Sequence, residues 1–127
     1  MKVKLWGVRG SHPKADQRML GHGGDTACVE VWADSGELIV IDCGTGAIGL
    51  GRALAARGPG LKGAMLFSHT HWDHIQGVPF FAPFFIPGNE WDVYAPHGLG
   101  QSIRETLSGQ MQYDNFPVSL EDMGAAI

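Results

Sequence analysis

The chain has 127 residues, with nine Lys and Arg against thirteen Asp and Glu, so its formal net charge is −4. This length supports one domain, and the 44% hydrophobic and 17% charged shares are those of a folded globular protein. The few cations are scattered along the chain, which argues against a sequence-independent nucleic-acid binder. The longest uncharged stretch, residues 75–89, is interrupted by prolines and too short to span a bilayer. We therefore expect no membrane partner.

The two cysteines, Cys28 and Cys43, are too few for a disulfide scaffold or a four-thiolate zinc site. We expect both to be buried free thiols in a reducing compartment. The first residues alternate like a strand and show no basic region followed by an apolar stretch, the pattern of a secretory signal. A cytoplasmic protein is the expectation.

The first third of the chain predicts strands and a long loop. Residues 2–8 alternate in polarity and predict a strand, whereas residues 9–24 carry Gly, Pro and His without periodicity and predict a loop. Residues 27–33 and 37–42 are rich in β-branched side chains and are separated by the turn sequence Asp34-Ser35-Gly36. These two segments predict an antiparallel hairpin.

The remaining sequence predicts helices alternating with strands. Thr45 can cap a helix that runs to Arg57, where Gly and Pro follow and end it. Residues 64–68 are apolar and predict a strand covered on both faces, and residues 91–95 predict a further strand after a Pro-punctuated aromatic segment. Residues 99–109 predict a final helix. This order indicates an α/β fold with a mixed β-sheet and helices, in a single domain.

Metal-ligating side chains gather directly after the predicted apolar strand. His69 and His71 are two residues apart, so extended backbone places them on one side, and a turn can bring Asp73 and His74 toward the same point. Neutral imidazoles and a carboxylate are ligands that zinc accepts, and the carboxyl end of a strand is where α/β proteins place their sites. The alternative is that these residues are exposed loop residues or core histidines. Trp72 offers only a donor, so we expect it to pack rather than to ligate.

The motif His-x-His-x-Asp-His resembles the signature of the metallo-β-lactamase superfamily. A strand followed by residues 42–46 is similar to the superfamily's aspartate-glycine turn. Residues 7–11, 23–26 and 75–81 resemble the phosphodiesterase branch, which is related to cyclic-nucleotide phosphodiesterases and tRNase Z. The resemblance implies the N-terminal half of an αββα sandwich, so that residues 1–127 form one incomplete domain.

The resemblance also implies roles for single residues. His69 and His71 would hold a first divalent ion and Asp73 and His74 a second, with zinc expected and manganese or iron as alternatives. The metals would activate a water molecule for attack on a small phosphodiester, and Asp73 would also orient that water as a catalytic residue. Asp42 would lie behind the ligands and steady a ligating imidazole.

The superfamily completes its site with a further His, a bridging Asp and a final His, which this sequence does not supply. Its one later histidine, His97, is not expected to bind metal, and His12 and His22 are expected to be exposed loop residues. Three alternatives remain: a truncated hydrolase, a half-domain that pairs with itself as a homodimer, and a metal-binding module without catalysis. Residues 80–86 either pack beneath the metal loop or form an apolar surface for a partner or substrate.

Overall fold

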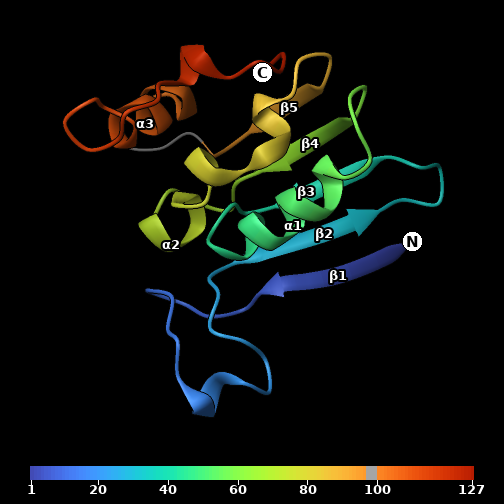
Figure 1. Cartoon of the computed structure of the whole chain (residues 1–127), viewed down its shortest axis with the longest axis vertical. Helices are drawn as coiled ribbons and strands as arrows, with labels where there is room; N and C mark the ends of the chain where they lie inside the picture. The colour runs from blue at the N-terminus through green and yellow to red at the C-terminus, as the bar shows by residue number, and fades with distance from the viewer. Residues whose placement is uncertain (97–99) are drawn as a thin grey trace.

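The computed structural model describes residues 1–96 and 100–127, and its helices and strands follow the predicted order (Figure 1). The strands are β1 (Lys2–Gly7), β2 (Cys28–Trp32), β3 (Leu38–Ile41), β4 (Lys62–Leu66) and β5 (Glu90–Tyr94). The α-helices are α1 (Gly46–Ala55), α2 (Trp72–Ile75) and α3 (Ile103–Gln110). Short 3₁₀ helices are η1 (Gln17–Met19), η2 (Val78–Phe80), η3 (Ala82–Phe85) and η4 (Leu120–Asp122).

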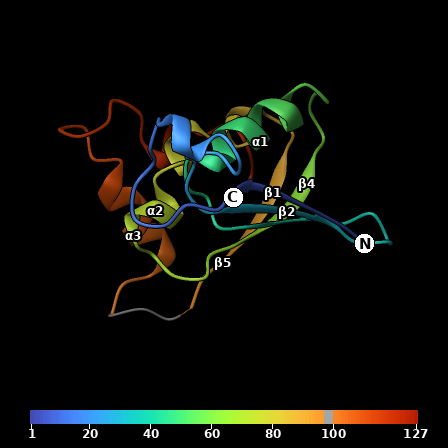
Figure 2. The same ribbon diagram turned by 90° about the horizontal axis from the view of Figure 1, so that it is seen from below.

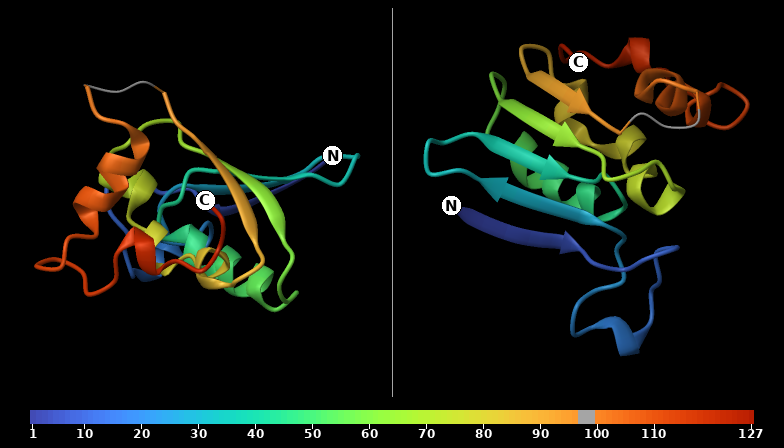
Figure 3. Two further views of the ribbon diagram at one scale, coloured as in Figure 1. Left: turned by 90° about the horizontal axis from the view of Figure 1, so that it is seen from above. Right: turned by 180° about the vertical axis from the view of Figure 1, so that it is seen from behind.

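The five strands form one mixed sheet in the order β1-β2-β3-β4-β5. β2 pairs antiparallel with β1 and β3, which confirms the predicted hairpin, while β3, β4 and β5 run parallel. The carboxyl ends of these three parallel strands therefore meet at one end of the sheet, where α2 and α3 also lie (Figure 3). The predicted α/β fold with a mixed sheet is confirmed.

Helix α1 covers one face of the sheet (Figure 2). On that face Leu38, Val40 and Met65 are fully buried beneath α1 and the η2–η3 segment. Their neighbours Ala64 and Leu66 point to the other face and are only half-buried. The prediction that the fourth strand is covered on both faces is therefore wrong, because in the described part of the chain no element lies over this second face.

The second face, which we call the open face, presents two rows of side chains that cross all five strands in register. One row is Val3, Val31, Ile39, Ala64 and Asp92, and the other is Leu5, Val29, Ile41, Leu66 and Tyr94. A cross-strand row of this kind is the packing unit of a sheet, and it stabilises most when another layer covers it. The open face is thus an apolar surface ready for a second layer.

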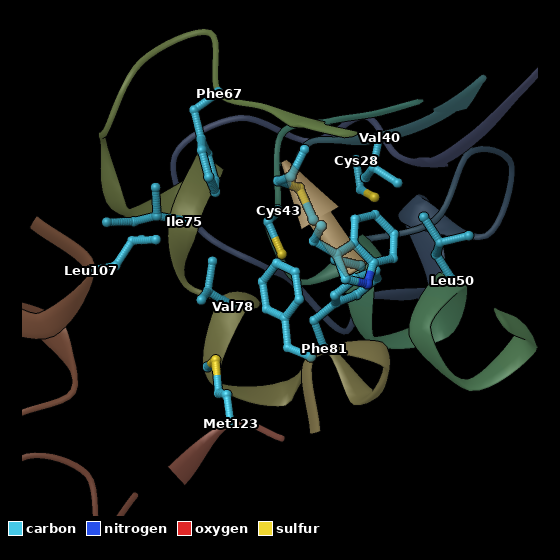
Figure 4. Packing of buried hydrophobic residues seen from close by; sticks show 14 of the residues in the cluster. Cys28, Val40, Cys43, Leu50, Phe67, Ile75, Val78, Phe81, Leu107 and Met123 are labelled. Atoms are coloured by element: carbon cyan, nitrogen blue, oxygen red, sulfur yellow. The ribbon is translucent and has the colours of Figure 1, made fainter. Parts of the chain in front are cut away.

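The core lies between the sheet and the aromatic segment that follows α2 (Figure 4). Phe81 and Phe84 are buried and pack edge-to-face on each other and on Trp91 of β5, with ring centroids 4.9–5.6 Å apart. Cys28 and Cys43 are buried and free, as predicted. The aromatic segment divides between the two predicted roles, because Phe80 is 52% exposed while Phe81 and Phe84 fill the core.

The ends of two helices differ from the prediction. Thr45 occupies the N-cap of α1 but forms no capping bond, because its hydroxyl accepts the N–H of Thr26 and donates to Asp25 instead. α3 begins later than predicted, at a capping box in which Ser102 and Glu105 bond each other's backbone N–H groups. None of the helices in the described ranges is long and apolar enough to cross a membrane.

Candidate metal centre

The histidine motif lies where β4 leaves the sheet. β4 ends at Leu66, Phe67 is buried as an anchor, and the chain then turns through His69 into the single-turn helix α2, which begins at Trp72. The N-cap of α2, His71, keeps an extended backbone with φ −64° and ψ 151°. This strand, loop and short helix bring residues from both halves of the motif to one point at the carboxyl end of the sheet (Figure 1).

The four predicted donors lie together. The ring centroid of His69 is 4.6 Å from that of His71 and 4.0 Å from that of His74. The Asp73 Oδ2 atom is 3.5 Å from His74 Nε2. The rings rest against one another in this arrangement, and among residues 1–96 and 100–127 no three His, Cys, Asp or Glu side chains are placed so that they could hold a metal ion together.

A carboxylate lies behind the histidines. The Nδ1 atom of His74 is 2.8 Å from Asp42 Oδ2, and because a carboxylate can only accept, Nδ1 is the donor of this hydrogen bond. In the neutral imidazole the lone pair is then on Nε2. The backbone N–H and the hydroxyl of Ser68 donate to Asp42 at 2.8–3.0 Å. The Ser68 hydroxyl oxygen is also 3.1 Å from His69 Nδ1, so this serine links the carboxylate to two imidazoles.

The backbone holds this carboxylate in an unusual conformation. Asp42 has φ +60°, a left-handed conformation that Asp tolerates better than most residues. Its N–H still donates to the Leu66 carbonyl at 2.8 Å, extending the β3–β4 ladder by one bond. The left-handed turn directs the buried carboxylate toward Ser68 and His74 across the end of the sheet.

Main-chain bonds fasten α2 to the turn after β3. The Cys43 N–H donates to the His74 carbonyl, and the Gly77 N–H donates to the Cys43 carbonyl, both at 2.8 Å. The two chains approach so closely that a Cβ atom on Gly44 would lie 2.2 Å from the Asp73 carbonyl oxygen. Glycine at this position therefore permits the contact that brings Asp42 and the motif together.

The first long loop also reaches the site. The N–H of Ser11 donates to Asp73 Oδ2 at 2.7 Å, although the two residues are 62 positions apart. This hydrogen bond lowers the pKa of Asp73 below its ordinary value against the effect of burial, with a smaller contribution from His74. The Asp73 carboxylate is thus kept ionised and oriented.

Sequence reasoning missed two of these residues and misplaced a third. Ser11 ends the segment 7–11, whose sequence suggested a family resemblance but no site residue, whereas Ser68 stands directly before the motif and could have been assigned to it. Trp72 was expected to pack, but its side chain is 77% exposed. His12 and His22 are exposed as expected, and His97 lies outside the described residues.

Comparison with known proteins now identifies the family. Residues 37–125 match the family model described as the beta-lactamase superfamily domain. The chain belongs to this superfamily. Neither the curated proteins nor the solved structures include a match to it. The matched range contains Asp42 and the whole histidine motif, whereas residues 7–11 and 23–26 precede it.

The candidate ligands of this beta-lactamase superfamily domain are of chemical types that bind divalent metal ions. Three imidazoles and the ionised Asp73 carboxylate are borderline ligands of the type that zinc accepts. The bond from His74 to Asp42 is the carboxylate–histidine pairing that fixes the tautomer of a ligating imidazole. Rotation of the exposed His71 ring and the half-buried His69 ring requires no change in the backbone.

Proposed function

We propose that this chain carries the metal-binding part of a metal-dependent hydrolase that cleaves small phosphodiesters. Membership of the superfamily gives the hydrolase-type fold. The observation that carries the proposal is the position of His74 between two carboxylates, with Nδ1 at 2.8 Å from Asp42 and Nε2 at 3.5 Å from Asp73. A carboxylate that accepts from one ring nitrogen and leaves the other directed at a second donor is the arrangement found behind ligating histidines.

The residues divide into ligands and a supporting carboxylate. His69, His71, Asp73 and His74 would hold one or two divalent ions, with zinc as the expected metal and manganese or iron as alternatives. A bound divalent ion lowers the pKa of a water molecule and draws charge from the oxygens of a phosphodiester. Asp42 would orient the His74 imidazole, and Asp73, which the Ser11 N–H keeps ionised, would orient the attacking water.

The phosphodiester specificity is supported by the first loop. Residues 7–11 and 23–26 resemble the phosphodiesterase branch, and Ser11 from the first of them bonds Asp73. This loop therefore takes part in the site rather than only connecting two strands. The buried free thiols of Cys28 and Cys43 suit a reducing compartment, and we include a cytoplasmic location in the proposal.

The metal part of the proposal is tested by elemental analysis of purified protein. We expect bound zinc, manganese or iron in the unmodified chain and its loss in a His69→Ala, His71→Ala double variant. The matched control is a His12→Ala, His22→Ala double variant, which removes two exposed loop histidines and is expected to keep the metal. Equal metal content in both double variants would place the site elsewhere.

Hydrolysis is tested with bis(p-nitrophenyl) phosphate. Four donors shared between two ions leave each ion two protein ligands, one fewer than an ordinary catalytic zinc site. We expect weak turnover by the isolated chain and a gain when a protein segment supplies further ligands. Turnover by a monomer at roughly 1 per second or faster, the usual enzymatic range, would contradict this ligand count.

The open face supports a second candidate function, a metal-binding module that pairs with a second copy of itself. The accessible surface is 7558 Å², about 1,000 Å² more than the roughly 6,600 Å² expected for a compact monomer of 13.6 kDa. An ordinary interface buries about 800 Å² on each partner, so pairing through this face would remove most of the excess. Light scattering should then show a dimer for the unmodified chain and for the turn variant Ser35→Lys, and a monomer for Ile39→Lys. A monomer in all three cases would exclude pairing through the open face.

A further inference from the structure

Strand β1 forms one edge of the sheet, and in the described part of the chain no segment pairs with its outer side (Figure 3). The opposite edge is different, because the N–H of Trp91 in β5 donates to the Ala126 carbonyl at 2.8 Å and the C-terminal segment lies beside that strand. An unpaired edge presents a row of backbone N–H and C=O groups to which another extended segment can bond. β1 is therefore the edge at which the sheet can be extended.

β1 carries different side chains on its two faces. Lys2 and Lys4 lie on the same side of the sheet as α1, whereas Val3 and Leu5 lie on the open face and are 53% and 62% exposed. We propose that β1 binds an extended acidic segment of a partner protein, in which acidic and apolar residues alternate. Such a segment, added as a sixth strand, would place its carboxylates next to the lysines and its apolar side chains next to Val3 and Leu5.

The lysines of β1 line a positively charged groove. This groove encloses about 700 Å³ between strands β1 and β2 and the C-terminal end of α1, where Arg57 lies. Among the described residues, Lys2, Lys4 and Arg57 form no ion pair, although the chain as a whole has a net charge of −4. Of the two carboxylates in the groove, Asp34 bonds the amino terminus and Glu30 bonds two tryptophans. The groove thus offers three cations to an acidic partner.

Two tryptophan rings hold two of these cations in position. The Lys4 Nζ atom is 3.6 Å from the ring centroid of Trp6, and the guanidinium carbon of Arg57 is 4.7 Å from that of Trp32. Both indole N–H groups donate to Glu30, one to each carboxylate oxygen, at 2.7 and 2.8 Å, which fixes the rings. Contact with a ring face positions a cation and leaves N–H donors free for a carboxylate. The cations are therefore oriented without being neutralised by an ion pair.

The lysines also select against a second copy of β1. Two β1 strands paired edge to edge, with their helices on the same side, would place lysines opposite lysines, and like charges at facing positions destabilise a sheet. Lysines on edge strands protect natural sheets from pairing with themselves in this way. A segment with carboxylates at alternate positions is attracted instead, so charge determines which segment can pair.

The groove lies away from the candidate metal centre. Trp32, at the end of β2, pairs with Leu38, the first residue of β3, whereas the histidine motif lies at the carboxyl end of the parallel strands. A segment bound at β1 would leave the motif uncovered. The inference therefore does not depend on the proposed hydrolase function.

The experiment compares two peptides of equal composition. Acetyl-Glu-Val-Glu-Val-Glu-Val-Glu-amide alternates, whereas acetyl-Glu-Glu-Val-Val-Val-Glu-Glu-amide has no two glutamates two residues apart and cannot place carboxylates beside both lysines in an extended conformation. Binding to the full chain is measured by amide chemical shifts, which also locate the peptide. We expect the alternating peptide to bind roughly 2- to 30-fold more tightly, the combined range for two cross-strand side-chain pairs, and to bind more weakly in about 1 M salt.

Charge reversal tests the lysines directly. The Lys2→Glu, Lys4→Glu double variant should lose affinity for the alternating peptide and gain affinity for its lysine counterpart, acetyl-Lys-Val-Lys-Val-Lys-Val-Lys-amide. The matched control is Arg52→Glu, Lys62→Glu, which makes the same change in charge at exposed positions outside the groove and should retain the preference for glutamate. Circular dichroism checks that each variant is folded. If the charge-reversed variant does not fold, the comparison of the two glutamate peptides on the unmodified chain decides alone.

Equal affinity for the two glutamate peptides would overturn the inference, as would shifts that spare the amides of β1. Unchanged affinity for the alternating peptide in the folded Lys2→Glu, Lys4→Glu variant would also overturn it. Inorganic phosphate is the last probe. If phosphate binds the groove as tightly as the alternating peptide, the cations form a general anion site and the proposed strand pairing is wrong.

Discussion

Replacing Asp42 with asparagine is expected to reverse the tautomer of His74. The Oδ1 atom accepts the Ser68 N–H, which can only donate, so the asparagine oxygen must stay at that position. The amide NH₂ then takes the place of Oδ2 and faces His74 Nδ1 at about the 2.8 Å of the present contact. Because the NH₂ group donates, Nδ1 must accept, and the imidazole proton moves to Nε2, the atom directed at Asp73.

A protonated Nε2 has no lone pair for a metal ion. Changes of this kind behind a ligating histidine weaken metal binding roughly 10- to 100-fold, or about 1.4–2.8 kcal/mol. The free energy of unfolding should change far less, because asparagine fills the same space and forms bonds to both neighbours. Zinc affinity is measured against a chromophoric chelator, and the tautomer by the nitrogen chemical shifts of the imidazole in metal-free protein.

The control is Asp92→Asn, which removes an exposed carboxylate from β5 and should leave zinc affinity unchanged. The Asp42→Ala variant should also loosen the metal, but less than His71→Ala, which removes a ligand. Equal losses in these two variants would make Asp42 a direct ligand. If Asp42→Asn binds zinc as tightly as the unmodified chain, or keeps Nδ1 of His74 protonated, the orienting role is refuted.

Three further predictions concern stability and reactivity. Phe81→Ala should lower the free energy of unfolding by roughly 3–5 kcal/mol in a denaturant titration, while the half-exposed Phe80→Ala costs less than about 1 kcal/mol; similar losses would refute the packing described here. Burial raises the pKa of Cys28 to about 12 and that of Cys43 well above its ordinary value, so neither thiol should react with a disulfide reagent at pH 8 until the protein is unfolded. Hydrogen bonds from the N-cap serine lower the pKa of Glu105 below 4.5. The ionised Glu105 therefore stabilises α3 fully above pH 4.5, and this stabilisation is lost as pH falls through the lowered pKa. If the helicity of Glu105→Gln is equally acid-sensitive, Glu105 is not the group responsible.

The sequence predicted the elements because their signals are local. Alternating and β-branched residues located the first three strands, an apolar run located β4 to within two residues, and the turn at residues 34–36 specified the hairpin. Local signals failed at the helix termini. From the sequence, the Thr45 hydroxyl could cap the helix α1. In the structure it bonds Thr26 and Asp25 instead, which lie in the segment that leads into β2. Such competition is decided by tertiary contacts, which no short window contains.

The sequence could predict which site residues lie close together only for the residues of the histidine motif. His69 through His74 follow one strand, so their proximity comes from local geometry. The contact of Ser11 with Asp73 spans 62 positions and depends on how the first loop folds back. The exposure of Trp72 was unpredictable for a related reason, because the sequence indicates that an indole prefers burial but not whether the core has room for it.

The main-chain bonds between Cys43, His74 and Gly77 have a consequence for the rates at which this end of the molecule moves. The amide hydrogens of Cys43 and Gly77 should exchange with solvent as slowly as those of the β3–β4 ladder, although both lie in turns. The segment carrying the imidazoles then opens only when the strand pair itself separates. The backbone around the site would already have its final conformation when a divalent ion binds. Only side chains would need to rotate, which takes picoseconds to nanoseconds at exposed positions. Capture of the ion would be limited by its diffusion and the loss of its hydration water, not by folding.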